Sequence, residues 1–529
     1  MNRQKLKESS DETSKTVNHS LHKIVRGTGI ITIGTILGMF FGFISQVIII
    51  RYLSQYQFGI FSLTIVITGI AMTISNLGMQ DGLTRFIASF RGKNEKEKVN
   101  IVISSTFKIL IIFSIIISLI IFILSDVFSD YIFLIPELSY SLKILSLSII
   151  YSVLINIFIS IFRGHDKVEP NIYFQNIFKN IVYLILISLI IWLNLSLVGI
   201  LYAYLFSIII SFVFFFIYTF KKGFLKKISF YTNKKSKKIT KKLLFFSIPL
   251  LGSSILNSIF HWTDTMLIGF YKTAETVGLY NAVLPLTSLL IIALSSASFI
   301  YVPIASGLFS KNLISELKRT YQILTKWIFF ITIPIFFILF LFPETVLNLF
   351  FGYEYIEAAV ILRILSIGFI THTIVGLNGL SLLVMGNTKF LMFASFVSAL
   401  FNVILNIILI PSIGIIGAAI ASLASYFLIN ILKSIKLYKV SKIHPFTKNY
   451  LKPLTINLIL FLLIFISTKY IDYKIWMLPI LLSIYLVCYT FLLLFTKSFE
   501  AEDVQLILAI ERKTGFKLNF LKKLLNRYI

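Results

Sequence analysis

Long apolar runs separated by short polar segments dominate this chain. The runs are about 18 to 25 residues long, which is the length a helix needs to cross the hydrocarbon core of a bilayer. Membrane β-strands would instead be about ten residues long and alternate in polarity, and these runs do not alternate. The pattern predicts an all-α integral membrane protein with about 14 transmembrane helices, at 28–50, 58–80, 101–124, 139–162, 171–193, 196–219, 244–271, 278–300, 325–342, 357–382, 390–410, 413–432, 450–468 and 476–496.

Composition supports the membrane assignment and removes two other classes. The 529 residues are 57% hydrophobic and 13% charged, which is too apolar for a soluble globular protein of this length. The net charge of +27 is divided into short clusters by the apolar runs, so it forms no continuous basic face and predicts no nucleic-acid partner. The single cysteine, Cys488, lies in a late apolar run, so no intramolecular disulfide can form.

The basic residues predict the orientation of the helices. With a cytoplasmic N-terminus, the segments assigned inside carry about 42 Lys and Arg and those assigned outside carry about four. Both termini are therefore expected to be cytoplasmic. The polar tail 1–26 has no apolar core and no cleavage site, so we expect no signal peptide and the first span to direct insertion.

Two further segments are expected on the cytoplasmic side. The basic run 221–243 lies near the midpoint and predicts a linker attracted to anionic headgroups, with a solvated loop favoured over a specific binding site. The tail 498–529 has acidic residues early, basic residues late and apolar residues at helical spacing. It predicts amphipathic helices lying on the membrane surface.

The two halves of the chain repeat each other. Five collinear matches occur at offsets of about 217 to 222 residues, and they align Gly59 with Gly278 and Lys143 with Arg363. Because the repeat unit holds an even number of spans, both halves have the same orientation, and the repeat axis runs along the membrane normal. This predicts an N-lobe at 27–220 (spans 1–6), a C-lobe at 244–435 (spans 7–12), two extra spans at 450–497, and a substrate path between the lobes.

The order of motifs resembles a known family. The segments are "RYLSQYQFG", "LGMQDGLTRFIASFRGK", "WTDTMLIG" and "FYKTAETVGLYNA". Together with two six-helix halves and two extra C-terminal spans, they resemble the polysaccharide-biosynthesis (oligosaccharide) flippases of the multidrug/oligosaccharidyl-lipid/polysaccharide exporter superfamily. The resemblance covers nearly the whole chain and rests on motif order and topology.

Span 7 carries a polar stripe. A charge near the bilayer centre costs about 2.5 to 3.5 kcal/mol, so intramembrane charges usually face the bundle interior or a watery cavity. A spacing of 4, 4 and 3 residues places the stripe on one helical face: it comprises Ser253, Asn257, His261 and Asp264. The repeat-related face of span 1 is a ridge of small residues, typical of close helix packing: Gly34, Gly38, Gly42 and Ser45.

Three cations are candidates for contacting a substrate. Arg363 is predicted at nearly the depth of Asp264, so we expect the two to pair, with a purely structural ion pair as the alternative. Lys143 is the repeat counterpart of Arg363, and both side chains suit phosphate oxygens; the alternative for Lys143 is snorkelling to the outer interface. In the resembling family an arginine matching Arg85 lies near the cavity mouth, while a positive-inside anchor is the plain interpretation. His261 is expected to be a hydrogen-bonded member of the stripe, and with Asp264 it forms the one pair nominated for proton coupling.

No motif predicts catalysis. Dinucleotide, Walker A and zinc-protease spacings are missing from the sequence, as is any Cys/His cluster, so we expect no enzyme activity, cofactor or metal. The resemblance implies a flippase that moves polyprenyl-(di)phosphate-linked oligosaccharide from the inner to the outer leaflet by alternating access. It also implies the plasma membrane of a prokaryote as location, and membrane lipids and glycan-assembly enzymes as partners.

Three alternatives stay open. A cation-coupled multidrug exporter of the same superfamily would need acidic residues in the cleft and would normally have 12 helices. A membrane-embedded glycan transferase or polymerase would need catalytic carboxylates in a sizeable outer loop, whereas the loops at 125–138 and 343–357 are short. A non-enzymatic scaffold has no positive signal in the sequence.

Overall fold

The computed structural model describes the chain outside residues 1–33, 226–233, 468–469, 471–476, 497 and 499–529. All regular elements in the described part are helices, which confirms the predicted all-α class. Thirteen described helices are long and apolar enough to cross a membrane. The fourteenth predicted span, 476–496, corresponds to the apolar helix α19 (Met477–Phe495). The predicted tail 1–26, and all of the predicted tail 498–529 except Ser498, lie outside the described residues.

The N-terminal half comprises the helices that precede the basic segment. They are the helix Gly34–Tyr52, α2 (Gln55–Ser75), α3 (Met79–Gly92), α4 (Lys96–Val127), the π-helix η1 (Phe128–Phe133), α5 (Leu138–Gly164), α6 (Glu169–Asn171), the π-helix η2 (Ile172–Phe178), α7 (Lys179–Trp192) and α8 (Leu197–Lys221).

The C-terminal half follows, with two extra helices after it. Its elements are α9 (Lys234–Tyr271), α10 (Ala274–Ser288), the 3₁₀-helix η3 (Leu289–Ile291), α11 (Ile292–Ser310), α12 (Ile314–Leu341), α13 (Pro343–Phe351), the 3₁₀-helix η4 (Tyr353–Ala358), α14 (Ala359–Val375), α15 (Asn378–Val384), α16 (Thr388–Ile413) and α17 (Ile415–Ser441). The extra pair is α18 (Lys448–Ser467) and α19.

Helix α3 was missed by the sequence prediction, which ended one span at residue 80 and began the next at residue 101. Helix α2 ends at Ser75, and the turn after it contains Leu77 and Gly78 with positive φ, so the chain changes direction before α3. Buried residues Met79, Leu83 and Ile87 then recur every fourth position, which is the pattern of an amphipathic helix. This stripe of three apolar residues is too short to be recognised in the sequence as a membrane span.

The membrane-spanning helices bury small polar residues and expose large apolar ones. On α4, Ser114 and Ser118 are buried, and the Ser118 hydroxyl donates to the Ser146 carbonyl of α5 at 2.8 Å. Small residues at such an interface let two backbones approach closely. The exposed side of α4 carries Leu119 and Ile123, which suits contact with lipid.

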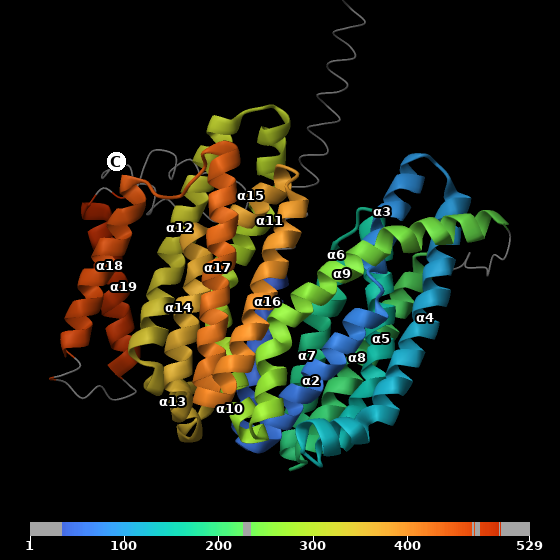
Figure 1. Ribbon diagram of the computed structural model, residues 1–529, viewed down its shortest axis with the longest axis horizontal. Helices are drawn as coiled ribbons and strands as arrows, with labels where there is room; N and C mark the ends of the chain where they lie inside the picture. Colours follow the sequence, from blue (N-terminus) through green and yellow to red (C-terminus); the bar gives the residue numbers. More distant parts are fainter. Residues whose placement is uncertain (1–33, 226–233, 468–469, 471–476, 497, 499–529) are drawn as a thin grey trace, which may run out of the picture.

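The two halves lie side by side and meet where α2 and α10 begin (Figure 1). Helix α9 crosses between them. Its first part is tied to the N-terminal half, since the hydroxyl of Thr240 donates to Ser105 at 2.8 Å and that of Ser258 donates to Thr73 at 3.2 Å. Its last part packs on α16 and α17. Because α9 begins at Lys234, the end of the predicted linker 221–243 is helical.

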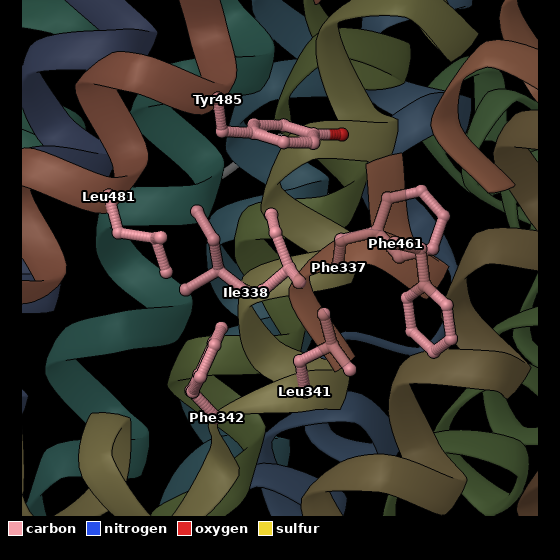
Figure 2. A pocket seen from close by; sticks show the side chains of 8 residues that line it. Phe337, Ile338, Leu341, Phe342, Phe461, Leu481 and Tyr485 are labelled. Atoms are coloured by element: carbon pink, nitrogen blue, oxygen red, sulfur yellow. The ribbon is translucent and has the colours of Figure 1, made fainter. Parts of the chain in front are cut away.

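The extra helices α18 and α19 lie on the far side of the C-terminal half, where α18 packs against α12 (Figure 1). A small apolar pocket of about 20 Å³ lies where the three helices meet. Figure 2 shows aromatic and aliphatic side chains converging on it; the lining residues are Phe337, Ile338, Leu341, Phe342, Phe461, Ile464, Leu481 and Tyr485. The Tyr485 hydroxyl donates to Asn457 within the pair. This pair is therefore docked through apolar packing.

Candidate functional site

Asp264 is a buried carboxylate that accepts hydrogen bonds from four side chains. Its side chain is buried, and both oxygens accept from C-terminal-half side chains. The hydroxyl of Tyr280 on α10 donates at 2.5 Å, and the Ser422 hydroxyl on α17 donates to the same oxygen. The amides of Asn406 and Asn402, both on α16, donate to the other oxygen at 2.7 and 3.3 Å. One carboxylate thus joins α9 to α10, α16 and α17.

The predicted pairing of Asp264 with Arg363 is wrong. The Arg363 guanidinium lies 2.9 Å from a carboxylate oxygen of Glu344, at the start of α13, and donates to the Phe340 carbonyl at 3.1 Å. Two residues at similar depth need not face each other, because depth does not determine how each helix is rotated about its axis. The carboxylate of Glu344, at the start of α13, lies nearer to Arg363. Pairing there also avoids fully desolvating two charges.

Lys143 is paired in the same manner in the other half. Its ammonium contacts both carboxylate oxygens of Asp126, near the end of α4, at 2.8 and 3.0 Å. Asp126 and Glu344 are acids from the two loops considered for a transferase, and both are engaged in ion pairs with partly exposed cations. The repeat therefore conserves an acid–base pair at one end of each half.

These two pairs predict small effects on transport. Exposed ion pairs contribute about 0 to 1 kcal/mol, so we expect Lys143→Ala to change the initial transport rate by less than about twofold. The measurement is transport per reconstituted protein at matched expression. A tenfold loss with unchanged thermal stability would place Lys143 in the substrate path after all.

The polar stripe of α9 is divided by the structure. Asn257 lines a cavity of about 380 Å³ between α2, the start of α3 and α9, and the cavity wall also includes Ser253, Asn76 and Asp81. His261 is exposed, whereas Asp264 is turned into the C-terminal half. The four donors to Asp264 are other residues, so His261 and Asp264 are not joined by a hydrogen bond.

Arg85 lies on α3, at the N-terminal-half side of α9. Its guanidinium stacks over the Phe246 ring of α9, 4.4 Å from the ring centroid. Arginine suits this position because its planar cation pairs with the electron-rich ring face. Arg85 thus connects α3 to the bridging helix α9.

A second polar cavity was missed by the sequence prediction. It has a volume of about 440 Å³ and lies between the helix Gly34–Tyr52, the η2–α7 segment and the end of α10. Its lining residues are Thr35, Gly38, Met39, Gly42, Phe43, Gln46, Gln175, Asn176, Lys179, Asn180 and Ser288. The signal was present in "FQNIFKN", where four polar residues fall within a predicted span. No role was predicted for Lys179, although it lies within the predicted span 171–193.

The predicted small-residue ridge forms one wall of this cavity. A Cβ built on Gly38 would lie 2.7 Å from the Asn176 carbonyl oxygen, so only glycine allows this approach. The Asn180 amide donates to the carbonyls of Gly38 at 2.9 Å and Asn176 at 2.8 Å. These contacts hold the polar side of η2–α7 against the first described helix.

The polar side chains described above suit the binding of a ligand and of a coupling ion. The Asn406 side-chain oxygen beside Asp264 is buried and accepts no hydrogen bond from the described residues, so the cluster has an acceptor free for a proton donor or a cation. Among those residues, no group of three His, Cys, Asp or Glu side chains is placed to ligate a metal ion.

Two helical halves around polar cavities define a multi-pass membrane protein with the fold of the multidrug/oligosaccharidyl-lipid/polysaccharide exporter superfamily. The chain belongs to the polysaccharide biosynthesis protein family, whose model matches residues 24–309, and this confirms the resemblance seen in the sequence. A MatE family model also matches residues 249–408.

Solved structures share the fold. The lipid II flippase MurJ in an inward closed conformation superposes with a TM-score of 0.70 at 17% identity, over 87% of this chain and 97% of that one. An inward-facing MATE-family multidrug resistance transporter has a TM-score of 0.61 at 16% identity, over 79% of this chain and 99% of that one.

Two relatives match part of the sequence. A probable low-salt glycan biosynthesis flippase, Agl15, of Haloferax volcanii is 29% identical over 202 residues, which are 38% of this chain and 43% of that protein. An uncharacterized membrane protein of Methanocaldococcus jannaschii is 28% identical over 198 residues, which are 36% of this chain and 38% of that protein. The matched segment therefore spans less than half of each relative.

Proposed function

We propose that this protein is a flippase that moves a polyprenyl-(di)phosphate-linked oligosaccharide from the inner to the outer leaflet by alternating access. The observation that carries the proposal is the cavity around Lys179. The described part of its wall combines one cation with amides and hydroxyls and contains no carboxylate. Such a wall suits an anionic head rich in hydroxyl groups. The family match and the names of Agl15 and MurJ support the same class of substrate.

Alternating access requires that one end of the path be closed, and contacts between the halves at one end support this mechanism. Where α2 and α10 begin, Arg51 donates to the carbonyls of Leu349 and Phe350, the latter at 2.7 Å. The Gln55 amide donates to the Glu354 carbonyl at 2.6 Å. In the proposed orientation, with cytoplasmic termini in a prokaryotic plasma membrane, this end is the outer one. Substrate would then enter from the inner leaflet, where glycan-assembly enzymes would supply it.

The second candidate is a multidrug exporter, which the MatE match favours. Lipophilic cations would need acidic groups in the path. Asp81 lines the cavity beside Asn257 and is exposed, but Asp264 is enclosed by donors within the C-terminal half. More of the residues that line the two cavities suit the substrate of a flippase than suit a lipophilic cation.

The test is reconstitution of the full-length protein into liposomes that contain a fluorescent lipid-linked oligosaccharide. We expect the fraction of label protected from a membrane-impermeant quencher to change with time in proteoliposomes and to stay constant in empty liposomes. A cationic dye assay on the same vesicles separates the two candidates. Dye export without movement of the oligosaccharide would reject the flippase proposal.

A further inference from the structure

Lys179 holds a charge near the middle of a membrane span. The continuous helical segment Glu169–Trp192 places it 10 residues after Glu169 and 13 before Trp192. At about 1.5 Å per residue this is roughly 15 Å from the nearer end, beyond easy snorkelling to an interface. Its retention in the span therefore requires a polar surrounding.

The ammonium of Lys179 is unpaired within the described residues. No hydrogen bond or ion pair joins it to them, whereas Lys143 and Arg363 each contact a carboxylate. Among the described residues, no acidic side chain lines the cavity that Lys179 faces. A cation held in a membrane without a counter-charge is most readily explained by a ligand that supplies one.

The local backbone presents a polar face toward this cavity. The segment η2, Ile172–Phe178, is a π-helix directly before Lys179, and π-helical turns frequently occur at functional sites. Gln175, Asn176 and Lys179 line the cavity from it. Gln46 faces them from the first described helix and is exposed. Amides can both donate and accept, which suits sugar hydroxyls beside an anion.

The cavity spans the interface between the halves. Ser288, the last residue of α10, contributes an exposed hydroxyl from the C-terminal half. Helical geometry changes just after it to the 3₁₀-helix η3. A ligand bound here would contact both halves, so its binding would respond to their relative movement.

We propose that Lys179, with Gln46, Gln175 and Asn176, forms a subsite for an oxyanion attached to hydroxyl-rich sugar in the transported molecule. This rests on the proposed flippase function. The oxyanion has two sources in such a molecule: the phosphate that joins lipid to sugar, or the carboxylate of an acidic sugar. Lys143 and Arg363, the cations nominated from the sequence, contribute to the fold at the end where the halves meet.

The test measures binding by full-length protein in nanodiscs. The probes are a polyprenyl monophosphate, a soluble acidic oligosaccharide and a soluble neutral oligosaccharide. We compare wild type with Lys179→Gln, Lys179→Arg and the control Lys143→Gln. Loss of one charge-assisted hydrogen bond should raise the Kd of the relevant anionic probe about 10- to 100-fold in Lys179→Gln. Lys179→Arg should restore most of the affinity, and the neutral probe and Lys143→Gln should show little change.

The outcomes separate the sources and the proposals. Selective loss for the polyprenyl phosphate supports the lipid-linked phosphate, and selective loss for the acidic oligosaccharide supports the sugar carboxylate. Equal anion affinities in wild type and Lys179→Gln, or no anion binding by wild type, overturn the subsite. Because binding is measured without transport, a wild type that binds through Lys179 but does not flip substrate rejects the flippase and retains the subsite. Size-exclusion profiles and thermal unfolding of each variant establish that it is folded.

Discussion

Replacing Asp264 by alanine is expected to abolish transport and lower the thermal stability of the protein. The carboxylate accepts hydrogen bonds from Tyr280, Asn402, Asn406 and Ser422. Its removal takes the acceptor from Tyr280, Asn402 and Ser422, whereas the Asn406 amide still donates to Asn402. Each buried group left unsatisfied costs about 1 to 3 kcal/mol. Since the four donors lie on three helices, α10, α16 and α17, the C-terminal half would lose a shared contact point.

A second variant separates the structural role of Asp264 from coupling. Asp264→Asn keeps the shape and one acceptor oxygen, and the neighbouring hydroxyls can rotate to accept from the new amide. We expect it to fold with a thermal midpoint close to wild type but to transport at least about tenfold more slowly, because an amide does not take up a proton or carry the charge that binds a cation. The matched control is Asp126→Asn, which alters the exposed pair with Lys143.

The measurement is the flipping rate against imposed proton and sodium gradients, together with thermal unfolding in detergent. If one gradient accelerates flipping by the wild type but not by Asp264→Asn, the ion of that gradient is the coupling ion. Transport by Asp264→Asn that equals wild type under every gradient would show that Asp264 has a structural role alone.

The number and order of membrane spans could be predicted because apolar length alone determines them. The helices α4, α5 and α8 begin and end within a few residues of the spans predicted at 101–124, 139–162 and 196–219. Helix α3 could not be found this way, since its burial comes from packing against α5 and α9. The length of α9 was also underestimated, because its basic first turns are helical yet not apolar.

The candidate site was predicted less well than the fold. Sequence spacing placed Asn257, His261 and Asp264 on one face of the helix. Such a face is about 100° wide, so its residues can have different surroundings: here Asn257 lines a cavity and Asp264 is buried between helices. The partner of Arg363 depended on the position of the α13 start, which no periodicity specifies. Lys179 fell within the predicted span 171–193 and was given no role, although the amides around it already indicated a polar wall within the span.

The repeat explains why some features match between the halves and others differ. Lys143–Asp126 and Arg363–Glu344 are equivalent pairs, and Gly59 and Gly278 occupy equivalent positions near the starts of α2 and α10. The interior differs, with glycines along one helix and the polar stripe of α9 along its counterpart. Of these symmetric features, the two ion pairs each lie within one half, and the two glycines lie where the halves contact each other.

Replacing Gly59 by valine is expected to open the end where the halves meet and to slow transport at least tenfold. A Cβ on Gly59 would lie 1.8 Å from the Ala274 carbonyl oxygen, and one on Gly278 would lie 2.1 Å from that of Gln55. Both obstacles are backbone atoms, so α2 and α10 must separate to admit any side chain. A transporter that cannot close this end cannot complete its cycle. The control is Gly69→Val on α2, since a Cβ at Gly69 meets nothing within 4 Å.

The change in conformation can be measured by cysteine labelling. The exposed Cys488 is first replaced by serine, and Ser254→Cys is introduced in the wall of the cavity that contains Asn257. In the Gly59→Val background we expect a membrane-impermeant maleimide to reach this cysteine from the outside of intact cells, and labelling from outside to stay low with native Gly59 or with Gly69→Val. Low outside labelling in Gly59→Val, together with wild-type transport, would show that the α2–α10 contact does not close the path. Gly278→Val should behave as Gly59→Val does, because the two glycines approach each other's helix at the same crossing.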